Sequence, residues 1–345
     1  MAEEREIRAL PCASCILCGS SGTFIHTGQQ DRLFGAYGLW NFKACSDPTC
    51  GLIWLDPMPI TEDIAKAYAS YYTHKSRADV RQPKLLKRVL ELMERGYWAG
   101  KYKYPVAGST MVEAIGKLLY LLPLRRSAAD GDVRFLTAVP NGRLLDVGCG
   151  SGEWLLFMRG LGWEVAGIDF DQRAVSIAVQ NGLKVRCGAL EEGNFPTASF
   201  DAVVLNHVIE HVPDPVATLL ECSRILRPGG KVVLFTPNSS SLGHKLFKTE
   251  WRGLEPPRHL HIFSMQSLSR ILKQTRFRTV SVRPQLARSI IHESVLLSWG
   301  QIGFDSVTRR NCRAATFARL FNLLELCLLS WRPTISDCVA AIGVK

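Results

Sequence analysis

A glycine-rich turn between an apolar run and a helical pattern is the feature that most limits the fold of this chain. Residues 143–147 are typical of a short buried strand, and Gly148, Gly150 and Gly152 follow it directly. Apolar residues then recur at helical spacing over residues 154–161. Glycines at such a turn let the backbone approach a ligand closely. The pattern therefore predicts the strand, turn and helix of an open α/β sheet.

A second predicted strand, residues 163–168, ends in Asp169, 21 positions after Gly148. An acidic residue about 20 positions beyond the first glycine can bind ribose hydroxyls. The spacing of the glycines is G-x-G-x-G, not the G-x-G-x-x-G of dinucleotide enzymes, and Asp146 places a carboxylate at the end of the first strand. A negative charge there suits a ligand that carries an ammonium and a sulfonium better than it suits a pyrophosphate. S-adenosylmethionine is such a ligand.

Residues 144–152 resemble the first motif of the class I S-adenosylmethionine-dependent methyltransferases, and the resemblance covers roughly residues 141–282. Further stretches that resemble family motifs are residues 167–171 at the ribose-binding strand end, 199–204 as the fourth strand, 206–212 after it, and 226–235 through the fifth strand. The chain is similar to the branch that contains ubiquinone-type O-methyltransferases and the methyltransferases of sugar and polysaccharide biosynthesis.

The resemblance implies an α/β fold with a doubly wound, Rossmann-like, seven-stranded sheet. Its last strand would be antiparallel, with residues 337–344 as the candidate. The cofactor-binding residues it implies are Asp146, Gly148, Gly150, Gly152, Asp169, Phe170, Ala189, Leu190 and Asn206. Many relatives carry an acidic side chain just after the glycine that ends the third strand, whereas Ala189 follows Gly188 here. Glu191 or backbone groups would then take the adenine contact.

Five of the eleven cysteines gather near the N-terminus. Two pairs, spaced C-x2-C and C-x4-C and each followed by glycine, offer four thiolates for a tetrahedral zinc site: Cys15, Cys18, Cys45 and Cys50. Cys12 is a competing fifth ligand, and a set of free thiols is the alternative. A four-thiolate site is closed, so the zinc ion would be structural. Residues 50–57 are similar to a zinc-binding preface found in front of some family members.

These patterns predict a division of the chain into five parts. They are a cysteine-rich zinc-binding module (1–60), a helical linker or cap (61–138), the cofactor-binding core (139–285), a helical insertion (286–333) and the closing strand (334–345). Within the insertion, residues 314–331 are strongly apolar, but four polar residues recur at every third position: Thr316, Arg319, Asn322 and Glu325. They fall across one half of a helix, which favours an amphipathic helix over a membrane span.

The net charge of +11 lies mainly outside the core. Residues 75–134 hold 13 basic and 6 acidic side chains, and residues 270–333 hold 11 and 3. One interpretation is solvated helix faces, including a helix over residues 84–97 with a second over 111–122 against it. The other is a cap that admits an anionic or lipid-linked acceptor, or that rests on an acidic membrane surface. We expect no nucleic-acid partner, since no recognition motif accompanies the charge.

Methyl transfer to a hydroxyl needs a positioned acceptor and a general base. His207 directly follows the fourth predicted strand and is the first candidate base; His259, in the segment 257–264, is the second. Arg252 and Arg258 are candidates for binding an anionic acceptor. Aromatic residues that could form a flap over the cofactor are Tyr68, Tyr71, Tyr72 and His74.

The sequence therefore predicts an S-adenosylmethionine-dependent methyltransferase that acts on a hydroxyl of a small-molecule or lipid-linked acceptor, a saccharide or a quinone precursor. A non-catalytic module that retains cofactor and docks a partner through its zinc region is one alternative, and a nicotinamide oxidoreductase is another. The first ten residues carry Glu3, Glu4 and Glu6 and lack the apolar stretch of a secretory signal, so we expect a cytoplasmic protein, peripheral to the membrane if the basic helices bind it.

Overall fold

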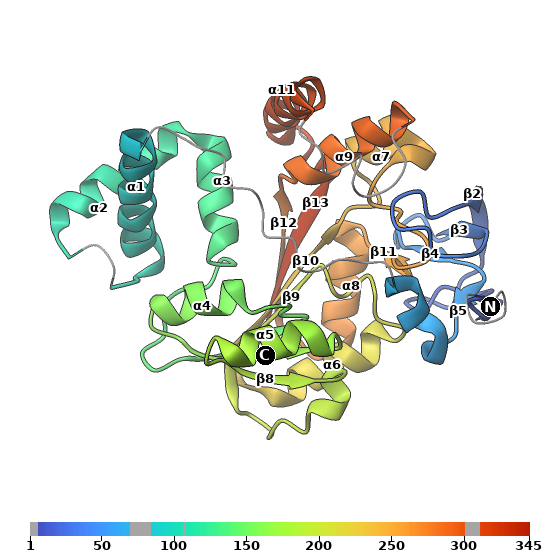
Figure 1. The fold of residues 1–345 in the computed structure, drawn as a ribbon, viewed down its shortest axis with the longest axis horizontal. Helices are drawn as coiled ribbons and strands as arrows, with labels where there is room; N and C mark the ends of the chain where they lie inside the picture. Colours follow the sequence, from blue (N-terminus) through green and yellow to red (C-terminus); the bar gives the residue numbers. More distant parts are fainter. Residues whose placement is uncertain (1–5, 70–83, 106–107, 301–310) are drawn as a thin grey trace. The chain divides into compact units, whose positions relative to one another are not determined.

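The computed structural model describes residues 6–69, 84–105, 108–300 and 311–345 (Figure 1). The chain divides into two compact units, neither of them continuous in sequence. Unit 1 comprises Met1–Tyr71, His207–Leu220 and Leu234–Gly343, and unit 2 comprises Tyr72–Asn206, Glu221–Val233 and Val344–Lys345. A seven-stranded sheet has the strand order β12-β13-β10-β9-β6-β7-β8. This order is that of a doubly wound α/β fold, as the sequence predicts.

Unit 2 is built on parallel strands: β6 (Arg143–Val147), β7 (Glu164–Asp169), β8 (Lys184–Cys187) and β9 (Phe200–Asn206). Strand β6 pairs in parallel with both β7 and β9, and β7 pairs with β8. Leu144, Leu145 and Val203 are fully buried. Near-continuous apolar runs of this kind are typical of parallel strands that are covered on both faces.

Two helices of unit 2, α1 and α2, pack closely where each has a glycine. The helical elements of this unit are α1 (Lys84–Tyr102), α2 (Thr110–Gly116), η3 (Lys117–Leu121), α3 (Pro123–Asp132), α4 (Glu153–Gly160), α5 (Gln172–Gln180) and η4 (Leu190–Gly193). A Cβ atom at Gly96 would lie 1.9 Å from the carbonyl oxygen of Val112, and one at Gly116 would meet the backbone of Gly96. The expected packing of a second helix on α1 is thus confirmed at this crossing, whereas Leu86 and Val89 on the first half of α1 are exposed.

The closing strand β13 (Cys338–Val344) lies between β10 (Leu226–Pro237) and β12 (Thr279–Gln285). At one end of β10 the amide of Gly229 donates to the carbonyl of Lys345, and at the other end the amide of Asn238 donates to that of Asp337. Residue numbers therefore increase along β10 in the direction in which they decrease along β13, so the two strands are antiparallel. The predicted antiparallel closing strand is confirmed.

Unit 1 contains a four-stranded sheet of order β11-β4-β3-β2, formed by β2 (Gly22–Gln29), β3 (Trp40–Cys45), β4 (Ile53–Leu55) and β11 (His261–Ile262). All of its strand pairs are antiparallel. Phe42, Leu55, Trp251 and Ile262 lie in one buried cluster of this unit. The cysteine-rich residues and the segment that contains His259 thus share one sheet and one core. A short pair, β1 (Ala9–Leu10) with β5 (Met58–Pro59), precedes η2 (Thr61–Tyr68).

The insertion is helical, as expected, but its helix α11 (Cys312–Leu329) has an unexpected orientation. Asn322 and Glu325 are buried, while Leu320 and Leu324 are exposed. The remaining helical elements are α6 (Pro215–Ile225), α7 (Leu242–Phe247), η5 (Lys248–Glu250), α8 (Met265–Gln274), α9 (Arg288–Ser298) and η6 (Pro333–Ile335). Among the described residues, no helix is both long and apolar enough to cross a membrane.

Candidate active site

The glycine turn of unit 2 needs its glycines for backbone and steric reasons. Gly148, Gly150 and Gly152 all have positive φ, at 72°, 53° and 81°. A Cβ atom at Gly152 would lie 2.2 Å from a methyl group of Leu183, whereas a Cβ at Gly150 would meet nothing within 4 Å. Since the left-handed conformation disfavours side chains, Gly150 is required for its φ. The space beside it leaves room for a ligand to approach the backbone.

Asp169 fixes the turn to the end of β7. Its carboxylate accepts hydrogen bonds from the amide of Gly150 (2.7 Å) and the amide of Asp171 (2.9 Å). Phe170, next in the chain, is exposed. The turn and the predicted ribose-binding strand end are thus held together by one carboxylate.

Asp146 is a buried carboxyl at the end of β6. Burial raises its pKa to about 7; the charge of Asp169 also raises it, and Arg134 opposes the shift. Near neutral pH the protonated and ionised forms are therefore both populated. A positively charged ligand beside this group would favour ionisation.

At the third strand end a carboxylate lies against the backbone. It belongs to Glu192, which accepts a hydrogen bond from the amide of Ala189 at 3.1 Å; the adenine contact expected of Glu191 or backbone groups stays a prediction. A Cβ atom at Gly188 would lie 3.0 Å from the same carboxylate. Leu190 is buried. Sequence reasoning missed Glu192, although its position three residues after Ala189 is the usual spacing of a capping residue.

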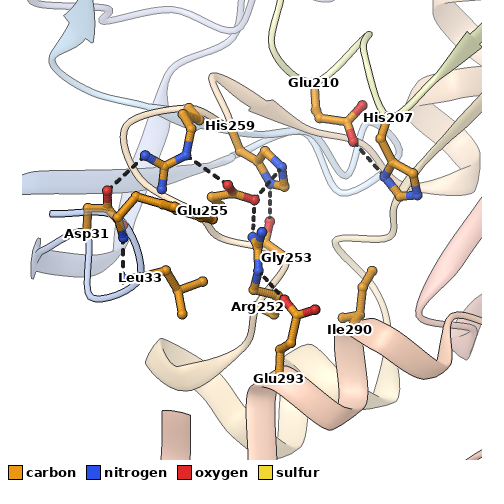
Figure 2. Close-up of polar contacts among 12 residues, drawn as sticks. Asp31, Leu33, His207, Glu210, Arg252, Gly253, Glu255, His259, Ile290 and Glu293 are labelled. Carbon is orange, nitrogen blue, oxygen red and sulfur yellow. Dashed lines mark hydrogen bonds and ion pairs between the residues drawn. The ribbon is translucent and has the colours of Figure 1, made fainter. Parts of the chain in front are cut away.

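His207 and Glu210 form a hydrogen-bonded pair at the start of the second segment of unit 1 (Figure 2). The His207 Nδ1 lies 3.1 Å from the Glu210 Oε1. Because an ionised carboxylate only accepts, the ring donates through Nδ1, and its Nε2 is then the unprotonated nitrogen. The His207 side chain is 43% exposed, whereas Glu210 is fully buried. Burial alone would raise the pKa of Glu210, but the hydrogen bond and charge of His207 hold it below its usual value.

This geometry is what a general base requires. His207 has a φ of 55°, and its amide donates to the carbonyl of Phe235 at 2.9 Å, so the turn that presents the ring is itself fixed. A buried carboxylate that orients an accessible imidazole sets which ring nitrogen takes up a proton. Sequence reasoning named His207 but missed Glu210, for which the signal was its position three residues later in the motif 206–212.

His259 is buried and faces other polar groups (Figure 2). Its Nδ1 donates to the carbonyl of Gly253 (2.7 Å), and its Nε2 lies 3.4 Å from a carboxylate oxygen of Glu255. Desolvation lowers its pKa to about 4, against the opposing charge of Glu255. The ring packs edge-on against His211, with 4.7 Å between centroids. Ligand-type atoms of Glu210, His211 and His259 all lie within 4.8 Å of one another.

The two arginines expected to bind an anionic acceptor already form ion pairs within unit 1, as Figure 2 shows for Arg252. Arg258 is buried and pairs with Asp31 and Glu255, at 2.8 Å each. Arg252 pairs with Glu255 and with Glu293. These ion pairs therefore fix the segment that leads to His259, and contact of Arg252 or Arg258 with an acceptor stays a prediction. Of the proposed flap, Tyr68 hydrogen-bonds to Nδ1 of His211 at 3.0 Å; Tyr71, Tyr72 and His74 lie outside the described residues.

The four predicted metal-ligating cysteines come together in unit 1. Their Sγ atoms lie within 4.8 Å of one another, with 3.7 Å between Cys15 and Cys50 and 3.3 Å between Cys18 and Cys45. A zinc–sulfur bond of about 2.3 Å gives a tetrahedron with edges of roughly 3.8 Å, which these distances approach. Cys12, the competing fifth ligand, is outside this group, and its thiol faces the carbonyl of Ser14.

The thiols of this cluster also differ in acidity. Burial raises the pKa of Cys15, and it raises that of Cys45 to about 11. Burial acts in the same direction on Cys18, but hydrogen bonds from Ser20 and from the neighbouring thiols lower its pKa to about 6. The lowered pKa favours the thiolate form of Cys18, and thiolates are the form that binds metal.

The fold and the site together are typical of one class of protein. A doubly wound α/β sheet carries a glycine turn after one strand, an acidic residue at the end of the next strand and a histidine after a third. Residues 120–282 match the sequence model of the family described as "Methyltransferase domain". The strand order and the glycine spacing agree with this match, so residues 120–282 resemble a methyltransferase domain of the S-adenosylmethionine-dependent class.

Curated relatives support the same class over part of the chain. The ubiquinone biosynthesis O-methyltransferase of Xanthomonas oryzae pv. oryzae is 42% identical over 103 residues, which are 28% of this chain and 43% of that protein. The enzyme of the same name from Thiobacillus denitrificans is 33% identical over 111 residues, 30% of this chain and 48% of that protein. The matches thus span less than half the length of these relatives.

Solved structures are similar at low scores. The phosphoethanolamine N-methyltransferase 2 of Haemonchus contortus, in complex with S-adenosyl-L-methionine, has a TM-score of 0.46 and 16% identity, over 85% of this chain and 62% of that one. A methyltransferase from Archaeoglobus fulgidus has a TM-score of 0.43 and 22% identity, over 66% of this chain and 99% of that one.

Proposed function

We propose that this protein transfers the methyl group of S-adenosylmethionine to a hydroxyl of a small-molecule or lipid-linked acceptor, a saccharide or a quinone precursor. The observation that carries the proposal is the His207–Glu210 pair, which follows β9 without an intervening residue. O-methylation is the reaction in the names of the relatives from Xanthomonas and Thiobacillus. In open α/β sheets, ligands bind outside the carboxyl ends of the strands, where β9 ends.

The residues of unit 2 fit this cofactor. The backbone beside Gly150 is open to a ligand, and Asp146 supplies a carboxyl at the adjacent strand end. We assign the cofactor to these groups together with the remaining predicted residues: Gly148, Gly152, Asp169, Phe170, Ala189, Leu190 and Asn206. When bound, the cofactor supplies a methyl carbon activated by its positive sulfur, so the protein has mainly to position the acceptor.

His207 would act as the general base. As the acceptor oxygen forms its bond to the methyl carbon, the hydroxyl proton passes to the Nε2 of His207, and the electrons of the carbon–sulfur bond remain on sulfur. The imidazolium that forms is stabilised by the carboxylate of Glu210. We propose that His259, the second candidate base, supports the His207–Glu210 pair indirectly. It is buried, and its hydrogen bond to Gly253 holds its own segment in place.

We further propose that Cys15, Cys18, Cys45 and Cys50 bind one structural zinc ion. The amide of Gly19 donates to the carbonyl of Cys15, and the hydroxyl of Ser264 donates to that of Cys50. Each thiolate pair is thereby held on a fixed turn. A reduced thiolate site also fits the predicted cytoplasmic location, since thiols persist in a reducing compartment. The predicted division of the chain into five parts remains a proposal beside the two observed units.

Methyl-labelled S-adenosylmethionine, incubated with the protein and a lysate of its source cells, tests the function. Label that reaches a product with wild type, and falls at least about a hundredfold with His207→Gln, supports the mechanism. Partition of the product between water and organic solvent separates a saccharide from a lipid-linked acceptor. Binding of S-adenosylhomocysteine without turnover would support the alternative of a non-catalytic binding module. Binding of NADH instead of S-adenosylhomocysteine would support the alternative of a nicotinamide oxidoreductase.

A further inference from the structure

The outward face of α11 is apolar, although a helix at the surface of unit 1 would ordinarily turn its polar side outward. The exposed side chains recur at helical spacing: Phe317, Leu320, Leu323, Leu324 and Leu328, followed by Trp331. Leu320 is 61% exposed and Trp331 87%. From Phe317 to Leu328 this face extends about 16 Å along the helix axis. We call these six residues the apolar face of α11.

The orientation of the helix is fixed by polar contacts on its other side. The Glu325 carboxylate accepts hydrogen bonds from the amide of Asp337 (2.7 Å) and from the side chain of Asn322 (3.0 Å). Ala318 and Phe321 pack into a buried cluster with Val295 of α9. Since Glu325 is fully buried, rotation of the helix to hide its leucines would break these bonds. The apolar face is therefore held outward by the fold.

The exposed charges of α11 and its flanking residues have one sign. In residues 311–332 the charged side chains are Arg313, Arg319 and Arg332, which are exposed, and Glu325, which is buried. Residues 270–333 as a whole hold 11 basic and 3 acidic side chains. An apolar helix face bordered by arginines, with a tryptophan at one end, has the composition of a helix that lies in a membrane interface. Each arginine near an anionic surface adds roughly fivefold to the affinity.

We propose that the apolar face of α11 binds an anionic phospholipid bilayer, lying parallel to its surface with the leucines below the headgroups and the arginines at the phosphates. The occupant is a lipid surface rather than a second copy of the chain because the border is uniformly basic, and two copies of a basic border would repel. This inference concerns where the protein binds and is independent of which acceptor it methylates.

Flotation with vesicles tests the proposal on the full chain. We expect wild type to float with vesicles of equal parts phosphatidylcholine and phosphatidylglycerol, and to stay behind with phosphatidylcholine alone. The Leu320→Gln/Leu324→Gln variant should lose at least about tenfold in vesicle affinity. Leu39→Gln is the matched control, because Leu39 is 62% exposed in the same unit and lies outside α11. Equal binding of S-adenosylhomocysteine by all variants shows that their folds are intact.

Two further measurements decide between occupants. Trp331 fluorescence, isolated by comparison with Trp331→Phe, should shift to the blue on addition of the anionic vesicles. Sedimentation without lipid should give the same mass for wild type and for the double-leucine variant. Failure of wild type to float, or equal flotation of the variant, would overturn the proposal. A wild-type dimer that the leucine substitutions dissociate would instead assign this face to a second copy.

Discussion

The ionisation of Asp146 should make the affinity for the positively charged cofactor depend on pH. Its pKa is about 7 in the free protein because it is buried, and a cation beside it lowers that value. The cofactor should then bind more tightly as the pH rises from 6 to 8, by about tenfold, and level off above that. Calorimetric titration with S-adenosylmethionine measures this slope.

The matched variants for this pH dependence are Asp146→Asn and Glu164→Gln. Asn cannot ionise, so its variant should bind weakly and with no slope between pH 6 and 8. Glu164 is an exposed carboxylate on neighbouring β7, and its loss should leave the slope unchanged. A slope that survives in Asp146→Asn would show that another group titrates.

Glu210 is expected to be a positioning residue for His207. Glu210→Gln keeps the shape of the side chain but removes the negative charge that stabilises the imidazolium. The turnover number should fall by about ten- to a hundredfold with little change in KM, and the acidic limb of the pH–rate profile should move to lower pH, because the imidazolium loses its neighbouring negative charge. His292→Gln, on α9, is the control. An unchanged pH–rate profile in Glu210→Gln would contradict the assignment.

Several single residues were predictable because chemistry and chain position coincide. His207, Asp169 and the three glycines sit at strand ends that the apolar pattern already locates. Glu210 and Arg258 were not, since their roles depend on contacts that a linear pattern does not contain. Arg258 pairs with Asp31, 227 positions away, and its burial follows from that distant carboxylate.

At the scale of elements, the cysteine turns should depend on metal. Removal of the ion with a chelator should destabilise the β11-β4-β3-β2 sheet of unit 1, because the two cysteine turns would lose the metal bonds that hold them together. We expect about one zinc ion per chain in wild type, and clearly less in Cys18→Ser, by elemental analysis. Cys12→Ser is the control, because Cys12 lies outside the cluster. Equal zinc loss in both variants would contradict the assigned ligand set.

The α1–α2 crossing makes a second prediction for an element. Gly96→Ala places a methyl group against the backbone of Val112 and should lower the free energy of unfolding by about 1–3 kcal/mol. Gly100→Ala, one turn later in the same helix, meets nothing within 4 Å and should be neutral or stabilising, by up to about 1 kcal/mol. Denaturant unfolding of both variants measures the difference, and equal effects would rule out a close crossing.

The helices show where sequence patterns stop being informative. The position of α11 follows from its apolar spacing, but which side faces outward depends on Glu325 meeting the amide of Asp337. A hydrophobic pattern specifies an amphipathic helix without specifying what it packs against. For the same reason the exposed residues Leu86 and Val89 of α1 could not be distinguished in advance from core residues.

For the whole molecule, buried carboxyls set how stability depends on pH. Burial raises the pKa of Glu325 to about 7 and that of Asp146 similarly, and burial beside Glu325 raises that of Asp337 well above its usual value. Each of these carboxyls therefore binds more protons in the folded state than in the unfolded state between about pH 4.5 and 7, whereas buried His259, with its lowered pKa, acts in the opposite direction. The contribution of the carboxyls to the free energy of unfolding should fall as the pH rises through that window.

Thermal unfolding at pH 5.5 and pH 8 measures this effect. The stability of wild type relative to Glu325→Gln should fall between pH 5.5 and pH 8, by on the order of 2 kcal/mol, because Gln cannot ionise. Glu62→Gln, an exposed residue of the same unit, is the control. An equal pH dependence in wild type and in Glu325→Gln would show that Glu325 ionises without cost.

The sequence patterns predict five consecutive parts, but the two observed units are each discontinuous in sequence. This interleaving could not be predicted from the sequence. The chain passes between the units at residues 71, 206, 220, 233 and 343, so no single break separates them. Sequence patterns locate strands well but say little about which distant segments share a core.

The pairing of β4 with β11 also limits which segments of the gene can be exchanged by recombination. Ile53 and Trp54 lie opposite Ile262 and His261, and Arg258 is neutralised by Asp31. A recombination event that exchanged the first 60 residues alone would leave an open strand edge and a buried charge without its partner. The N-terminal region and the segment around residues 251–263 should therefore be transmitted as one block, although some 190 residues separate them in the gene product.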